Sequence, residues 1–161
     1  MSGRKTRRNP AVASAAAPPL AGLDPGRSKC GLVRSDARGE RIVAAGVLDP
    51  DRCWQLLRRW RQQDLITAVL LGDGTGSGPW HQRCAQLDLP VLSVGEAGTT
   101  LAARQRFWQL APPRGWRRLL PQGLRLPPRD IDDVVAQLLL ERHLGRDLER
   151  DGAEWLGGGP G

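Results

Sequence analysis

The sequence predicts an α/β domain in which three antiparallel strands come first and β-α units follow. Three observations lead to this prediction. Short apolar runs separated by turn residues fill the segment 20–47, a strand, a glycine-rich loop and a helix cover 66–87, and another strand and helix cover 91–110. The resulting order βββαβαβα, followed by a last helix, is typical of one α/β domain rather than of two separate domains.

The first three strands form a predicted antiparallel meander. An apolar run from Leu20 to Leu23 is followed by the turn 24–27, and a second run extends from Cys30 to Val33. Turn residues 37–39 precede a third run, Arg41–Val47. Because tight turns join antiparallel neighbours, these three runs are expected to lie side by side in the sheet.

Helices and further strands alternate in the rest of the domain. Asp49 caps a predicted helix that has Pro50 in its first turn and ends near Asp64. The run 66–71 is the fourth strand, and a helix from 79 to 87 follows it. A fifth strand covers 91–94, the next helix covers 100–110 with Thr100 as its expected cap, and the last helix covers 130–144 with an apolar stripe.

Four segments are expected. Residues 1–18 form a flexible basic N-terminal tail, because four basic residues and no acid occur among mostly small side chains. Residues 19–146 form the folded domain, and within it 111–129 is an insertion rich in Arg, Pro and Trp. Residues 147–161, which end in several glycines, are predicted to be a C-terminal tail.

The chain of 161 residues is strongly basic, with a net charge of +7. Only Lys5 and Lys29 among its 24 basic residues are lysines, so the others are arginines, which bind phosphate in a bidentate manner. A GC-rich genome would also favour arginine codons. The basic charge alone therefore does not distinguish a nucleic-acid-binding protein from a protein encoded by a GC-rich genome.

Cysteine content and hydropathy exclude other classes of protein. The three cysteines, at 30, 53 and 84, are widely spaced and form no C-x-x-C pair, which argues against zinc and disulfides. No stretch reaches the roughly 18 apolar residues that span a bilayer. The sequence thus predicts a cytoplasmic protein without a membrane partner.

Three acids occur where chain turns would bring them together. Asp24 ends the first strand, Glu96 follows the fifth, and Asp132 lies in the first turn of the last helix. Clustered carboxylates suit Mg²⁺ or Mn²⁺, so this set is a candidate metal and catalytic site, with Asp73 and Asp133 as accessory ligands. Alternatively, the three are an ordinary turn residue, a surface acid and a helix cap.

Four stretches resemble, in order, the YqgF family, which is related to the RuvC-type Holliday junction resolvases. The strand-turn-strand 20–33 is similar to the family's opening, and 71–75 is similar to its Asp-Gly loop. The motif 95–100 resembles Asp-Glu-x-x-Thr-Thr, with Gly95 in place of the first Asp. The stretch 131–144 resembles the last helix, whose leading Asp is a catalytic carboxylate.

The resemblance implies an RNase H-like fold, with a five-stranded mixed sheet flanked by helices, and a metal-dependent endonuclease that takes Asp24, Glu96 and Asp132 as catalytic residues. It further implies pre-16S rRNA processing or Holliday-junction-type resolution. The opening and the stretch 112–121 are similar to a cyanobacterial branch of the family. Gly95 keeps a second interpretation open, namely a catalytically weak or inactive RNA- or DNA-binding module of the same fold.

Nucleic acid is the predicted partner because one segment is strongly polarised. Between Glu96 and Asp130 there are seven arginines and no acid, and Trp108 and Trp116 lie among them. Phosphate binding and base stacking are expected there, although each Trp is also a candidate for core packing. The predicted nucleic-acid-binding residues are Arg27, Lys29, Arg104, Arg106, Arg114, Arg117, Arg118, Arg125 and Arg129.

An actin-like phosphotransferase is a competing interpretation, because its fold also opens on an Asp-x-Gly turn. Such enzymes close two domains of this kind around a nucleotide, for which 161 residues are too few. Both a monomer and a homodimer remain compatible with the sequence, since two symmetric cuts across a junction would require paired sites.

Overall fold

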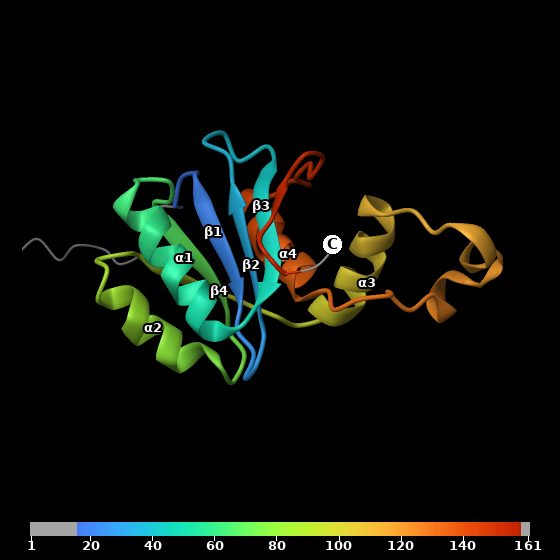
Figure 1. The fold of residues 1–161 in the computed structure, drawn as a ribbon, viewed down its shortest axis with the longest axis horizontal. Helices are drawn as coiled ribbons and strands as arrows, with labels where there is room; N and C mark the ends of the chain where they lie inside the picture. Colours follow the sequence, from blue (N-terminus) through green and yellow to red (C-terminus); the bar gives the residue numbers. More distant parts are fainter. Residues whose placement is uncertain (1–15, 159–161) are drawn as a thin grey trace, which may run out of the picture.

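The computed structural model describes residues 16–158, which build one mixed sheet with helices on both faces (Figure 1). Strands β1 and β2 are antiparallel, as are β2 and β3, whereas β4 and β5 run parallel to β1. The order β3-β2-β1-β4-β5 confirms the predicted RNase H-like class. The strands are β1 (Leu20–Asp24), β2 (Cys30–Ser35), β3 (Ile42–Leu48), β4 (Ala68–Gly72) and β5 (Val91–Val94).

Four α-helices cover the sheet in the predicted order. Helices α1 and α2 pack on one face and α4 on the other, while α3 lies against α4 (Figure 1). As predicted, Asp49 caps α1, accepting a hydrogen bond from Arg52 N at 2.9 Å. The expected cap at Thr100 is wrong, because α3 begins one residue earlier, after Gly98 at φ 70°. The helices are α1 (Pro50–Gln62), α2 (Ser77–Ala85), α3 (Thr99–Leu110) and α4 (Asp132–Leu144).

Two glycines let α4 lie directly on the sheet. A Cβ on Gly22 would overlap the backbone of Ala136, and a Cβ on Gly31 would overlap the backbone of Asp132. A larger side chain at either position would force the helix away from β1 and β2. The first turn of α4 is therefore held against the start of β2.

The C-terminal segment differs from the predicted tail. Strand β6 (Glu154–Trp155) pairs with β3 in parallel and makes the sheet six-stranded. Leu148 is fully buried and Leu156 is only 7% exposed. A strand of two residues is too short to show any alternation in the sequence, so apolar anchors after the last helix were the only available signal.

The two remaining segments lie at the margins of the fold. The predicted N-terminal tail falls outside the described residues except for 16–18. The insertion 111–129 carries two short 3₁₀ helices, Gly115–Leu119 and Gln122–Leu124, and extends away from the sheet (Figure 1). Within residues 16–158, none of the helices has the length and apolar character required to cross a membrane.

Candidate carboxylate site

Backbone register brings Asp24 and Asp132 together. Asp24 is the last residue of β1 and lies opposite Gly31 in β2. Gly31 is in turn the residue on which the Asp132 backbone rests. Because this contact leaves no room for a side chain, the start of α4 lies directly beside the end of β1.

Glu96 reaches the same end of the sheet from β5. Its strand ends at Val94, which pairs with Gly72 at the end of β4. The Glu96 carboxylate lies over the glycines of the loop after β4, where a Cβ on Gly74 would be 2.7 Å from Oε2 and a Cβ on Gly72 would overlap Oε1. Oε1 is buried and has no hydrogen-bond partner.

The loop that carries Glu96 is fixed from two sides. Asp73 Oδ1 accepts a hydrogen bond from Glu96 N at 3.0 Å. From α4, Arg142 donates to the carbonyl oxygens of Gly95 at 2.7 Å and Ala97 at 3.2 Å. Arg142 was not among the predicted site residues, because a single arginine at the end of a helix carries no distinctive pattern.

Burial and neighbouring charges act on two of the three carboxylates, Asp24 and Asp132. Burial, together with the smaller effects of the charges of Asp132 and Glu96, raises the pKa of Asp24 to about 7. Burial also raises the pKa of Asp132, with contributions from Asp130 and Asp133 that Lys29 partly offsets. Asp24 therefore carries a proton more readily than an ordinary aspartate, as expected where negative charges converge without a cation.

The available donors are carboxylate oxygens, the type of ligand that a hard divalent cation prefers. Asp132 and Glu96 lie close enough to Asp24 for their charges to raise its pKa, and Glu96 has a buried oxygen without a hydrogen-bond partner. Mg²⁺ and Mn²⁺ prefer such oxygen ligands and complete their shells with water and phosphate. In residues 16–158, however, no group of three or more His, Cys, Asp or Glu side chains is already arranged to hold a metal ion. Holding one would require these side chains to move closer together.

The two accessory acids have other partners. Asp73 is exposed, and its carboxylate orients the Glu96 backbone. Asp133 is fully buried, and both of its oxygens are occupied: Arg129 donates to Oδ1 at 2.7 Å, and Arg129 and Arg150 both donate to Oδ2. Asp133 thus belongs to a buried ion-pair cluster, which corrects its expected role as an accessory ligand.

Two of the predicted nucleic-acid contacts are also internal. Arg129 stacks over the rings of Phe107 and Trp155, at 5.3 and 4.9 Å from their centres, while it pairs with Asp133. Arg106 is 13% exposed and pairs with buried Glu141 at 2.8 Å. Both arginines serve the fold, and the prediction that they bind nucleic acid is corrected accordingly.

A polar row on α4 organises this interior. Asp133, Gln137 and Glu141 are spaced four residues apart and are all buried. Glu141 Oε1 accepts hydrogen bonds from Gln137 Nε2 and from Leu148 N, each at 2.9 Å. This spacing was visible in the sequence, but the apolar stripe of the same helix concealed it.

The other predicted basic residues remain at the surface or support the insertion. Lys29 forms an exposed ion pair with Asp130. Arg125 is held inward by the carbonyl oxygens of Leu120 at 2.9 Å and Arg118 at 3.1 Å. Arg117 lies 5.4 Å above the ring of Trp116. The exposed members of the set are Arg27, Lys29, Arg104, Arg114 and Arg118.

Fold and site together define an α/β protein of the RNase H-like class with carboxylates gathered at the carboxyl ends of β1 and β5. Among solved structures, the chain is similar to Thermus thermophilus RuvC in complex with a Holliday junction substrate, at 18% identity over 78% of this chain and 93% of that one, with a TM-score of 0.49. Another Thermus thermophilus RuvC structure gives 17% identity, coverage of 78% and 96%, and a TM-score of 0.41. No family model matches the chain, and no curated protein matches it. Function is therefore inferred from the residues of the site.

Proposed function

We propose that this protein is a divalent-metal-dependent endonuclease that hydrolyses phosphodiesters in structured nucleic acid. Asp24, Glu96 and Asp132 are the proposed catalytic residues and ligands for Mg²⁺ or Mn²⁺. The observation that carries the proposal is the placement of the three acids at one end of the sheet, where burial first, and then the charges of Asp132 and Glu96, raise the pKa of Asp24 to about 7. A nuclease site of this kind needs no protein nucleophile.

The residues of the chain prepare this site in separate ways. Gly31 and Gly72 provide the space in which Asp132 and Glu96 approach Asp24. Asp73 and Arg142 hold the loop of Glu96. Bound divalent ions would supply activation of the attacking water and neutralisation of charge on the phosphate.

The exposed arginines provide the proposed nucleic-acid contacts. Arg27 lies in the turn after Asp24, and Arg104 lies on α3. The other proposed contacts are Lys29 and, on the insertion, Arg114, Arg117, Arg118 and the more enclosed Arg125. Their contacts to phosphate would be salt-dependent. We assign the protein to the YqgF family on its motifs and propose a cytoplasmic role in pre-16S rRNA processing or junction resolution, as a monomer or homodimer.

A cleavage assay tests this proposal. Purified protein is incubated with Mn²⁺ or Mg²⁺ and with labelled structured RNA, a four-way DNA junction or linear duplex. The parent is expected to cut one of the structured substrates, and Glu96→Gln is expected to lose roughly 100-fold or more of that rate. Glu40→Gln, an exposed change at the opposite end of the sheet, is the matched control. Binding without cleavage by the parent would instead establish the non-catalytic module.

Gly72→Ala tests the packing of Glu96 without removing a carboxylate. The new methyl group would occupy the position of Glu96 Oε1, so the flexible end of that side chain must move away. Cleavage is expected to fall roughly 100-fold, as for other small misplacements of reacting groups, with little change in the melting temperature. Gly78→Ala, where a Cβ meets nothing, is the control. Full activity of Gly72→Ala would show that Glu96 need not lie over the loop.

A further inference from the structure

The insertion 111–129, which we call the arm, is connected to the carboxylate site at both ends. It leaves from the end of α3, a helix that begins three residues after Glu96. It returns to α4, which begins at Asp132. In Figure 1 the arm extends beyond the sheet and the helices that cover it. The arm therefore links the helix that begins after Glu96 to the helix that begins at Asp132.

The arm presents large apolar side chains to solvent. Trp116 is 65% exposed, Leu124 and Leu126 are similarly accessible at 66% and 64%, and Leu119 is 86% exposed. Apolar groups gathered in this way on a basic segment are typical of an interaction surface. The Arg117 guanidinium lies over the Trp116 ring, and the side chain stays mostly exposed, so the indole can also stack on a planar partner.

Internal hydrogen bonds brace the arm in this open form. Arg125 donates to the carbonyl oxygens of Leu120 and Arg118 within the arm. Trp108 of α3 donates from Nε1 to the Arg125 carbonyl oxygen at 3.0 Å and so anchors the arm to the body. These hydrogen bonds fix the backbone that carries the exposed side chains. Because the arm is already ordered, binding costs less conformational entropy.

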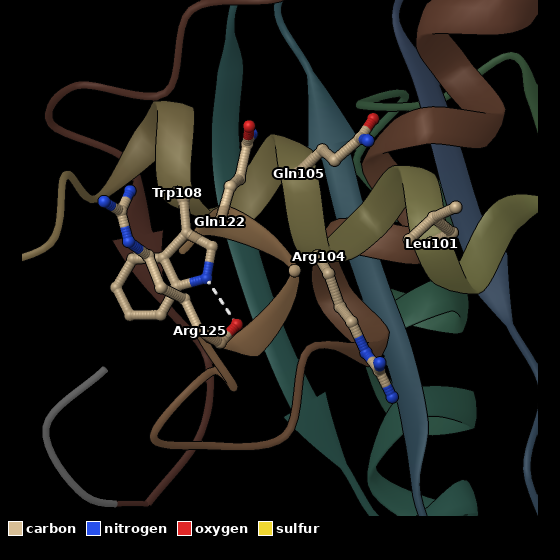
Figure 2. A pocket seen from close by; sticks show the side chains of 7 residues that line it. Leu101, Arg104, Gln105, Trp108, Gln122 and Arg125 are labelled. Atoms are coloured by element: carbon tan, nitrogen blue, oxygen red, sulfur yellow. Dashed lines mark hydrogen bonds between the residues drawn. The ribbon is translucent and has the colours of Figure 1, made fainter. Parts of the chain in front are cut away.

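A groove separates α3 from the arm (Figure 2). Its volume is about 140 Å³, far more than a single water molecule needs. Trp108 and Arg125 lie at one end, and Gln105, Gln122 and Arg104 line the rest. Each amide offers both donors and an acceptor, which is the chemistry that the edge of a nucleobase requires.

We propose that the arm binds unpaired nucleotides of the nucleic acid substrate, with one base in the groove and another stacked on Trp116. This inference rests on the proposed function and names the form of substrate that the site takes. The stretch between Glu96 and Asp130 contains no acid and seven arginines, of which Arg106 and Arg129 pair with buried acids. The other five match an anionic chain that also has apolar planar faces. Paired duplex hides those faces and edges, so the arm selects strands that are open.

The geometry places these nucleotides close to the cut. Arg104 and Trp108 lie five and nine residues into α3 from Thr99, which corresponds to about 7.5 and 13.5 Å along the helix axis. At roughly 3.4 Å per nucleotide of a stacked strand, the groove lies about two to four nucleotides from the start of α3. An open region of a few nucleotides beside the cleaved bond therefore suffices to engage it.

Binding in EDTA tests the arm independently of cleavage. Fluorescence anisotropy compares a labelled single strand with a blunt duplex of the same sequence. The parent is expected to prefer the single strand, and Trp116→Ala and the double change Gln105→Ala with Gln122→Ala are each expected to weaken that binding about 5- to 100-fold. Duplex binding should change little. Gln62→Ala, an exposed amide on α1, is the control.

Four outcomes would overturn the inference. If both variants bind the single strand as tightly as the parent, the arm does not bind the substrate. If their affinities for single strand and duplex fall equally, the arm contacts only phosphate. If the variants keep single-strand binding but lose binding to vesicles of mixed zwitterionic and anionic phospholipid, the arm binds a membrane. If they keep single-strand binding but lose a dimer in sedimentation, the arm binds a second copy of the chain. Because no divalent ion is present, none of these results depends on whether the protein cuts.

Discussion

Asp24→Asn is expected to abolish cleavage and, without divalent ions, to make the protein more stable. In the parent, folding places Asp24 beside Asp132 and Glu96 in a partly buried position, and the pKa of Asp24 rises from 3.8 to about 7. Above that pH the folded protein therefore holds a carboxylate that is better solvated in the unfolded chain. Asparagine removes this charge, so at pH 8 the free energy of unfolding should increase by about 1–3 kcal/mol.

The pH dependence identifies the cause of this gain. Since the folded pKa of Asp24 is raised, its contribution favours the folded state below about pH 4 and is lost as the pH rises to about 7. The stability difference between Asp24→Asn and the parent should therefore grow between pH 4 and pH 7 and then level off. Urea denaturation in EDTA across this range measures it, with Asp147→Asn as an exposed control. A variant less stable than the parent at pH 8 would contradict the convergence of charges.

Arg150→Ala is expected to produce the largest loss of stability. Arg150 is 14% exposed and donates to Asp133, whose side chain is fully buried between two arginines. Removing one arginine leaves a buried carboxylate with half of its partners and loosens the C-terminal segment that packs on β3. Breaking a buried pair of this kind costs about 3 kcal/mol or more.

Chemical denaturation of Arg150→Ala checks this expectation. Arg58→Ala, an exposed arginine on α1, is the control and should change the unfolding midpoint little. A loss below about 0.5 kcal/mol would mean that the cluster contributes no more than a surface ion pair. Because Asp133 directly follows Asp132, a large loss is also expected to lower the rate of cleavage.

Much of the fold was predictable because its elements carry local patterns. The alternation in β1 to β3, the cap at Asp49 and the breaks at the prolines after α3 each depend on neighbouring residues. β6 was not predictable, since two residues hold too little pattern and its pairing with β3 joins segments far apart in the chain. The same holds for Leu148 and Leu156, which are buried by contacts that no local period reveals.

The positions of the three proposed site acids were predictable from the sequence, whereas the residues that support them were not. Asp24 ends β1, Glu96 follows the end of β5 and Asp132 begins α4, and the fold brings those ends to one side of the sheet. For the arginines, the sequence gives the charge but not the partner. In the sequence Arg106 and Arg129 therefore looked like the exposed arginines near them. In the structure, buried Glu141 on α4 pairs with Arg106, and buried Asp133 in the first turn of α4 pairs with Arg129.

Mn²⁺ binding tests the central claim, a metal site built from three carboxylates, most directly. Electron paramagnetic resonance of free Mn²⁺ follows the ion as protein is added, and it requires neither substrate nor turnover. The parent and Asp147→Asn are expected to bind Mn²⁺ in a saturable manner and to melt at a higher temperature with it, whereas Asp24→Asn should do neither. A parent that leaves Mn²⁺ free, or an Asp24→Asn variant that binds it equally well, would contradict the site.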